Sequence, residues 1–176
     1  MSFQPLTLKS VRARPVMLTL KRPVVARIAT LTDWPLILID LYTEEGVIGR
    51  SYLEPYISKS MRYLIPALQD LGEMLKGRRL APIDLYDAAR KIAVVGYEGM
   101  SMIAVAGVDM AAWDSLAMAA GVPLCVLLGG SVGPVPAYNS NGLWLRSPDG
   151  GRKRGRRVTR GRRLSGVEAE HAYSDR

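Results

Sequence analysis

The side chains best suited to chemistry are carboxylates, and two of them lie on one alanine-rich stretch. Asp109 and Asp114 are five residues apart. If that stretch is a helix, five residues turn the chain by about 140° beyond a full turn, so the two carboxylates point to different faces. We therefore do not expect them to share a metal ion. Hydrogen bonding to neighbouring backbone is the better interpretation of both.

A second group of ionisable side chains lies near the C-terminus, and none of its members ends an apolar strand. This group comprises Asp149, Lys153, Glu168, Glu170, His171 and Asp175. His171 is the only histidine, and its spacing from Glu168 and Glu170 could suit a metal ion, but an open and flexible site binds weakly. We predict no catalytic residue and no metal ligand in this chain.

Cys125 is the only cysteine, which excludes an intramolecular disulfide and any cysteine cluster that binds a metal. It lies in the apolar run 124–128, so we expect a packed thiol and not a nucleophile. No run approaches the roughly 18 apolar residues of a membrane span, and Met1 to Ser10 lacks a signal-peptide pattern. We expect a cytoplasmic protein of about one domain that makes no membrane contact.

The net charge of +8 is concentrated in the last part of the chain. Residues 1–149 carry 15 basic and 13 acidic side chains, whereas residues 150–176 carry 9 and 3. The arginine- and glycine-rich segment 150–176 has almost no apolar content, so it cannot offset the entropy of ordering, and we expect disorder there.

Strand-like and helix-like segments follow one another through the first 149 residues. We predict strands at 6–20, with Pro15 as an interruption, at 35–42 and at 47–53, joined as an antiparallel meander. In the third strand, Val47, Gly49, Ser51 and Leu53 share one face.

Three helices follow the predicted meander. Met61, Leu64, Leu68, Leu71 and Leu75 recur at helical spacing, although Pro66 should kink or break that helix. Pro82 starts a second helix that runs towards Gly96. The third spans about 99–120 and ends at Gly121. Its buried stripe is predicted to be Ala104, Val108, Ala111, Ser115 and Met118.

Four separated segments resemble the mandelate racemase and muconate lactonizing enzyme family of the enolase superfamily. The signature is the stretch GVDMAAWD at 107–114, followed by Pro123-Leu124 and by LLGG at 127–130. The segments 35–41 and 46–53 also resemble the hairpin of that family's capping domain, closest to its mandelate racemase branch. The resemblance covers about residues 5–148.

The resemblance implies an α+β fold: an enolase-like N-terminal capping domain over residues 1–133, with a three-stranded antiparallel meander and a helical bundle. Residues 134–149 would hold the first strand of a truncated β/α barrel and its loop. The family removes a proton α to a carboxylate and stabilises the enediolate with Mg²⁺. The Mg²⁺ ligands and the base lie beyond the first barrel strand, so we expect this chain alone to be inactive.

The resemblance also implies where the cap would touch a small carboxylate substrate in a full-length enzyme. The matching positions are Val24, Ile28 and Leu31, in a loop predicted at 23–34, together with Tyr56, Ser140 and Asn141. Apolar loop residues that exclude water strengthen the electrostatics of a site. The alternative is that these side chains simply pack within the cap. The parent reaction, whether racemisation, dehydration or cycloisomerisation, stays open.

The abrupt change to arginine and glycine after Asp149 admits several interpretations. We favour translation of a GC-rich gene in a shifted frame. Under the alternatives, the tail is an Arg/Gly arm that binds nucleic acid, although it lacks interleaved aromatic residues, or a second chain supplies the barrel. A barrel cut after one strand leaves open edges, which predicts self-association.

The shifted-frame hypothesis makes a direct prediction about the gene. Translating the other two frames beyond codon 149 should recover a lysine-bearing strand and three spaced carboxylates. If the DNA sequence shows no such frame, the basic tail is genuine, and a salt-dependent binding assay with nucleic acid becomes the relevant measurement.

Overall fold

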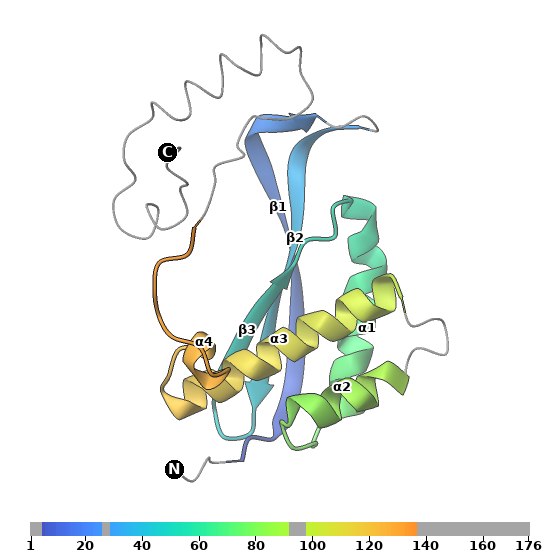
Figure 1. Ribbon diagram of the computed structural model, residues 1–176. Helices are drawn as coiled ribbons and strands as arrows, with labels where there is room; N and C mark the ends of the chain where they lie inside the picture. Colours follow the sequence, from blue (N-terminus) through green and yellow to red (C-terminus); the bar gives the residue numbers. More distant parts are fainter. Residues whose placement is uncertain (1–4, 26–28, 92–97, 137–176) are drawn as a thin grey trace. The chain divides into compact units, whose positions relative to one another are not determined.

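A computed structural model describes residues 5–25, 29–91 and 98–136 as a three-stranded sheet with helices (Figure 1). The strands are β1 (Leu8–Val25), β2 (Thr30–Thr43) and β3 (Ile48–Leu53). A 3₁₀ turn η1 (Ser58–Ser60) leads into α1 (Met61–Leu75), and α2 (Pro82–Arg90), α3 (Met100–Ala120) and α4 (Leu124–Leu127) follow. The predicted α+β class and antiparallel meander are confirmed.

The sheet has the order β1-β2-β3, so β2 is the central strand. β2 and β3 are antiparallel, with Leu41 opposite Gly49 and Ile37 opposite Leu53. Gly49 and Leu53 are buried, whereas Arg50 and Tyr52 are exposed. The predicted alternation of β3 is therefore confirmed, and one face of the sheet is turned towards the core.

β1 is longer than its predicted range of 6–20, because it continues to Val25. Pro15 lies inside the strand and does not interrupt it. A proline cannot donate a ladder hydrogen bond, but β1 is an edge strand, where a missing donor is tolerated. The prediction of an interruption was wrong for this reason.

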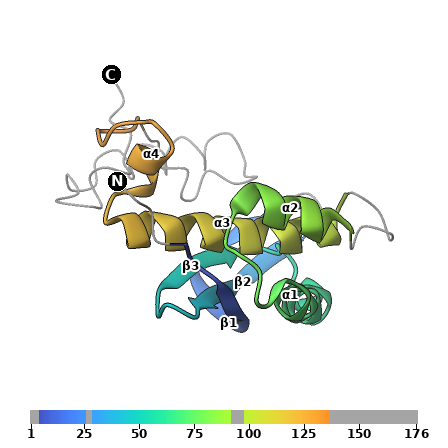
Figure 2. The same ribbon diagram turned by 90° about the horizontal axis from the view of Figure 1, so that it is seen from below.

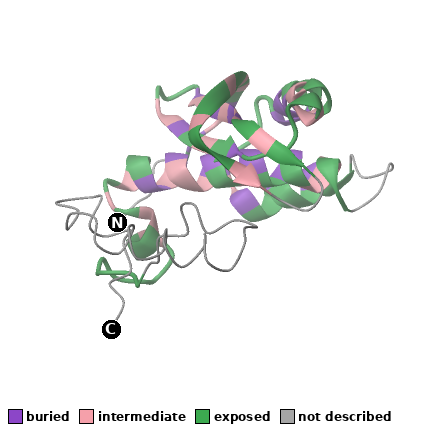
Figure 3. Ribbon diagram, turned by 90° about the horizontal axis from the view of Figure 1, so that it is seen from above, coloured by how far each residue is buried: buried purple, intermediate pink, exposed green. Residues whose placement is uncertain are grey.

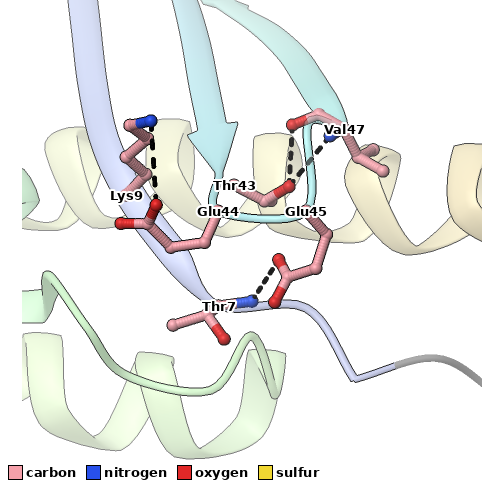
Figure 4. Close-up of polar contacts among 6 residues, drawn as sticks. All are labelled: Thr7, Lys9, Thr43, Glu44, Glu45 and Val47. Atoms are coloured by element: carbon pink, nitrogen blue, oxygen red, sulfur yellow. Dashed lines mark hydrogen bonds and ion pairs between the residues drawn. The ribbon is translucent and has the colours of Figure 1, made fainter.

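The turn between β2 and β3 is held by side chains and also ties down the start of β1 (Figure 4). The Thr43 hydroxyl donates to the Val47 carbonyl and accepts from the Val47 N–H, both at 3.0 Å. Glu45 accepts a 2.8 Å hydrogen bond from the Thr7 N–H, and this bond lowers the pKa of the Glu45 carboxyl. Lys9 pairs with Glu44 at 3.7 Å. The turn is solvent-exposed, yet it also connects two segments of the chain.

Helix α1 supplies a large share of the core through the predicted leucine stripe. Leu64, Leu68, Leu71 and Leu75 are all at most 1% exposed. Pro66 does not break the helix, which runs unbroken to Leu75. The exposed Pro66 costs one backbone hydrogen bond, and the buried leucines on either side of it offset that loss.

Helix α2 begins with Pro82 in its first turn, as predicted, and its described part ends at Arg90. Helix α3 matches its predicted range within one residue, and Gly121 ends it in the left-handed conformation with φ 66°. Ala104, Val108, Ala111 and Ser115 are buried as predicted. Met118 is 53% exposed, so its place in the buried stripe was wrong.

The length and composition of α3 would allow it to cross a membrane, contrary to the expectation that no segment would qualify. Eight of its residues are buried, however, and it contacts β3, α1 and α2. Figure 3 shows the buried residues gathered where α3 meets the sheet. We therefore describe α3 as a core helix.

Contacts divide the chain into two compact units. The first comprises Met1–Leu18 and Pro35–Ser131 and contains β3 and all the described helices. The second comprises Thr19–Trp34 and Val132–Arg176, so β1 and β2 each contribute to both units.

One expectation near the C-terminal end of the described chain was wrong, and a second falls mostly outside the described residues. Cys125 is exposed on α4, which has no buried residue, so the predicted packing of its thiol was wrong. The apolar run around it does not contribute to the core because a four-residue helix offers little surface to bury. Val135 and Pro136 are exposed and belong to no strand, and the rest of the predicted barrel strand lies outside the described residues.

The sheet and α3 meet through two glycines, and α3 crosses one face of the sheet (Figure 2). A Cβ atom at Gly49 on β3 would collide with the Ala111 carbonyl oxygen and the Ser115 hydroxyl oxygen. A Cβ atom at Gly107 on α3 would lie 2.6 Å from the Ile39 Cδ1 atom. Ser51 adds a 2.6 Å hydrogen bond to the Gly107 carbonyl. The backbones of β3 and α3 therefore lie closer together than residues with a Cβ atom at these two positions would allow.

Replacing Gly49 by alanine should lower the free energy of unfolding by at least about 2 kcal/mol, because the new methyl group meets backbone atoms that cannot move aside. Urea unfolding followed by circular dichroism measures this. Gly133→Ala is the matched control, since nothing lies within 4 Å of a Cβ there, and it should change stability by less than about 0.5 kcal/mol. Equal stability of the two variants would contradict the proposed close contact.

Candidate functional site

Arg14, Asp40 and Arg50 form a charged cluster across the three strands of the sheet. Asp40 is 7% exposed, and its Oδ2 accepts a 2.6 Å hydrogen bond from Arg14 Nη2. Its Oδ1 lies 3.5 Å from Arg50 Nε, which agrees with the register that places Asp40 opposite Arg50. The carboxylate is thus shielded between two guanidinium groups whose side chains are 46% and 66% exposed.

The cluster borders an open hollow of about 260 Å³, whose lining also includes Leu38 and Tyr52. The two guanidinium groups and one carboxylate give this cluster a net charge of +1. This cluster was missed in the sequence, although a signal exists: Asp40 interrupts an otherwise apolar run, and alternation places it on the face opposite Ile39 and Leu41.

Tyr56 is the predicted cap residue with the most unusual geometry. It is 65% exposed and is the one non-glycine residue with positive φ (55°) in the described part of the chain. Such a conformation is costly for a residue with a Cβ and often marks a functional segment. It lies in the short segment 54–57 between β3 and η1.

Val24 and Leu31 do not lie in a loop, so the prediction of a loop at 23–34 was wrong. Val24 belongs to β1 and Leu31 to β2, and both are partly exposed. β-branched and aliphatic residues continue the strand pairing almost to the tip of the hairpin. Val24 and Leu31 belong to the second compact unit and Tyr56 to the first.

The remaining predicted contact residues, Ile28, Ser140 and Asn141, lie outside the described residues. Within the described ranges, no group of three His, Cys, Asp or Glu side chains comes together in a way that could hold a metal ion. The described residues therefore do not fit a Mg²⁺ site.

Asp109 and Asp114 play different parts on α3. Asp114 accepts a 2.8 Å hydrogen bond from the backbone N–H of Arg50 on β3. The prediction that this carboxylate binds backbone is confirmed, but the expectation of neighbouring backbone was wrong, because Arg50 is 64 residues away in sequence. Asp109 makes no such bond in the described part of the chain, and burial raises the pKa of its carboxyl.

Comparison with known proteins places these features in a family. Residues 9–129 match the N-terminal domain of the mandelate racemase / muconate lactonizing enzyme family. The D-galactonate dehydratase of Klebsiella pneumoniae (strain 342) is 32% identical over 111 residues, which are 60% of this chain and 28% of the dehydratase.

Two solved structures share the fold closely. An enolase from alpha proteobacterium BAL199 with bound Mg is 60% identical, with a TM-score of 0.84 over 88% of this chain and 43% of the other. An enolase from Bradyrhizobium in complex with magnesium and mandelic acid is 39% identical, with a TM-score of 0.72 over 78% of this chain and 38% of the other. The chain thus spans less than half the length of each of these relatives.

Substitution of the two α3 carboxylates should have opposite effects at pH 7. Asp114→Ala leaves the Arg50 N–H without an acceptor and should cost about 1–3 kcal/mol of unfolding free energy. Asp109→Asn should stabilise the fold, because the folded state disfavours the charged form of Asp109. A carboxyl group whose pKa is raised on folding is harder to ionise in the folded state than in the unfolded state. It therefore lowers the free energy of unfolding as pH rises from its unfolded-state pKa through its folded-state pKa, and this penalty is absent below the unfolded-state pKa.

Urea unfolding measured at several pH values tests both parts. The advantage of Asp109→Asn should vanish at acidic pH, where Asp109 is protonated in both states. Asp114→Asn serves as the control, because its amide oxygen can still accept the Arg50 N–H and should retain part of the stability. A destabilising Asp109→Asn at pH 7 would show that Asp109 has a stabilising partner.

Proposed function

Because this chain belongs to the mandelate racemase / muconate lactonizing enzyme family, we propose that it supplies the capping domain of an enzyme that removes a proton α to the carboxylate of a small 2-hydroxy acid. The observation that carries the proposal is the agreement of the cap with a Mg-bound relative at 60% identity. The substrate class is inferred from the galactonate of one relative and the mandelic acid bound to another, which are both 2-hydroxy acids.

In this proposal the chain's own contribution is to cover and select the substrate. Tyr56 presents a large, exposed side chain on a strained backbone at the end of β3. Val24 and Leu31 add aliphatic surface on the hairpin. Side chains of this kind exclude water from a reaction site and so strengthen its electrostatic interactions. Ile28, Ser140 and Asn141 belong to the same proposed set.

The base and the Mg²⁺ ligands would come from the part of the fold that the relatives have beyond this cap. Helix α3 supports the presence of a further part of the fold beside the cap, because this helix is apolar on nearly all sides. Ile103 and Met110 on its outward side are 38% and 43% exposed, next to the exposed Ala106. A helix that is apolar all round is normally covered on both sides. We take this outward stripe as the surface on which the catalytic part of the fold would pack.

The proposal predicts that the 176-residue chain alone catalyses no exchange of the α-proton of mandelate or D-galactonate in D₂O with added Mg²⁺. A chimera of residues 1–136 with the remaining part of the 60%-identical relative should catalyse it. In the chimera, Tyr56→Ala should lower kcat/KM by about ten-fold or more, equivalent to about 1.4 kcal/mol. Proton exchange followed by NMR measures each quantity.

Tyr86→Ala on α2 is the matched control, since Tyr86 packs under the Arg90 guanidinium within its own helix. It should leave kcat/KM within about two-fold of the unmodified chimera. Exchange of the α-proton by the isolated chain would refute the proposal that the base and the Mg²⁺ ligands come from outside this chain. A folded chimera that binds Mg²⁺ and exchanges neither acid would refute the proposed substrate class, and equal effects of the two tyrosine variants would remove Tyr56 from the proposed set.

A further inference from the structure

Helix α3 carries two carboxylates and no basic side chain, and the two carboxylates differ in what they contact. Asp114 accepts the backbone N–H of Arg50. Asp109 makes no hydrogen bond or ion pair within the described ranges, although it is only partly exposed. A charged carboxylate that is partly withdrawn from water without a partner costs free energy, and burial accordingly raises the pKa of Asp109. The described cap therefore leaves the charge of Asp109 uncompensated.

Asp109 lies at the border between the buried and the outward sides of α3. Three residues of helix place it about 60° from the exposed Ala106, which belongs to the outward stripe with Ile103 and Met110. Ala112, three residues further along, is buried and lies about 60° away on the other side of Asp109. A surface that covers the outward stripe would therefore cover Asp109 as well.

We propose that Asp109 forms an ion pair with a basic side chain on the catalytic part of the fold, at the edge of the surface that packs against α3. This inference rests on the proposed function, because it takes the outward stripe of α3 as the surface on which that part packs. An apolar cover would take a lone charge further out of water, whereas a basic side chain would compensate that charge. Asp109 would then fix where the catalytic part sits on the cap, as a docking contact that touches no substrate.

The charge of the helical layer favours a basic partner. Helices α1, α2 and α3 carry six acidic and two basic side chains. Of the basic two, Arg90 lies over the Tyr86 ring and Arg62 is exposed on α1. On β3, Arg50 pairs with Asp40, and α4 has no charged residue.

The other acidic side chains on the helices that contact α3 are Asp70, Glu73, Asp84 and Asp87. None of the described basic side chains pairs with Asp109. Because complementary potentials orient two surfaces as they meet, this acidic layer suits a surface that carries arginine or lysine.

The effect of Asp109→Asn on stability should change sign when the catalytic part is present. In the full 176-residue chain this substitution should raise the thermal unfolding midpoint at pH 7, because it removes the penalty on the charged form. In the chimera of residues 1–136 with the remaining part of the 60%-identical relative, it should lower the midpoint by about 2 °C or more, because the basic partner loses its counter-charge.

NMR titration of the Asp109 side chain gives a second readout. The pKa should lie above the ordinary aspartate value in the 176-residue chain and below that value in the chimera, because an opposite charge favours the ionised carboxylate. Asp70→Asn on α1 is the matched control, since Asp70 is exposed on a helix, and it should shift neither midpoint by more than about 1 °C. A second chimera, with the remaining part of the 39%-identical Bradyrhizobium relative, replaces the first if that one does not fold.

A raised Asp109 pKa in both the chain and the chimera overturns the proposal, and so does an Asp109→Asn variant that stabilises both. Destabilisation of the 176-residue chain by Asp109→Asn also overturns it, because the partner would then lie within this chain. These readouts need no turnover. A folded chimera that exchanges neither acid would therefore refute the proposed substrate class and leave the test of Asp109 intact.

Discussion

The close approach of β3 to α3 is the constraint on which the described cap depends. At Gly49 the strand lies directly against the Ala111 carbonyl and Ser115 of the helix, Gly107 leaves room for the Ile39 and Leu53 side chains, and Ser51 bonds the Gly107 carbonyl. Asp114 completes it by accepting the N–H of Arg50. Because a protein interior is close-packed, a single methyl group at such a point cannot be absorbed by small local shifts. The small residues of the family signature follow from this geometry.

That contact also gives the sheet two chemically different faces. Buried aliphatic side chains such as Ile37, Ile39 and Leu41 point towards the helices and form the core. The opposite face carries Asp40 with its two arginine partners and is open to solvent. A buried carboxylate is tolerated there because two guanidinium groups surround it and meet its charge. The strands are therefore joined by packing on one side and by ion pairs on the other.

The described residues explain a cap and not a reaction centre. They bring together no set of metal-ligating side chains. Of the two carboxylates of α3, Asp114 accepts a backbone N–H and so supports the fold, whereas burial raises the pKa of the Asp109 carboxyl. Under the proposed function the cap would select the substrate, since an exposed Tyr56 with a positive φ and an aliphatic hairpin are suited to covering a ligand and not to reacting with it.

The sequence by itself determined the α+β class, the family, the order of strands and helices, and most of the core, because alternation and helical spacing report which side of each element is buried. The leucines of α1 and the left-handed cap at Gly121 were predictable in this way. Only the tertiary structure decided how Asp114 reaches β3, that Asp40 joins three strands, and that Cys125 and Met118 are exposed. These outcomes depend on contacts between residues far apart in the chain, and local periodicity carries no information about such contacts.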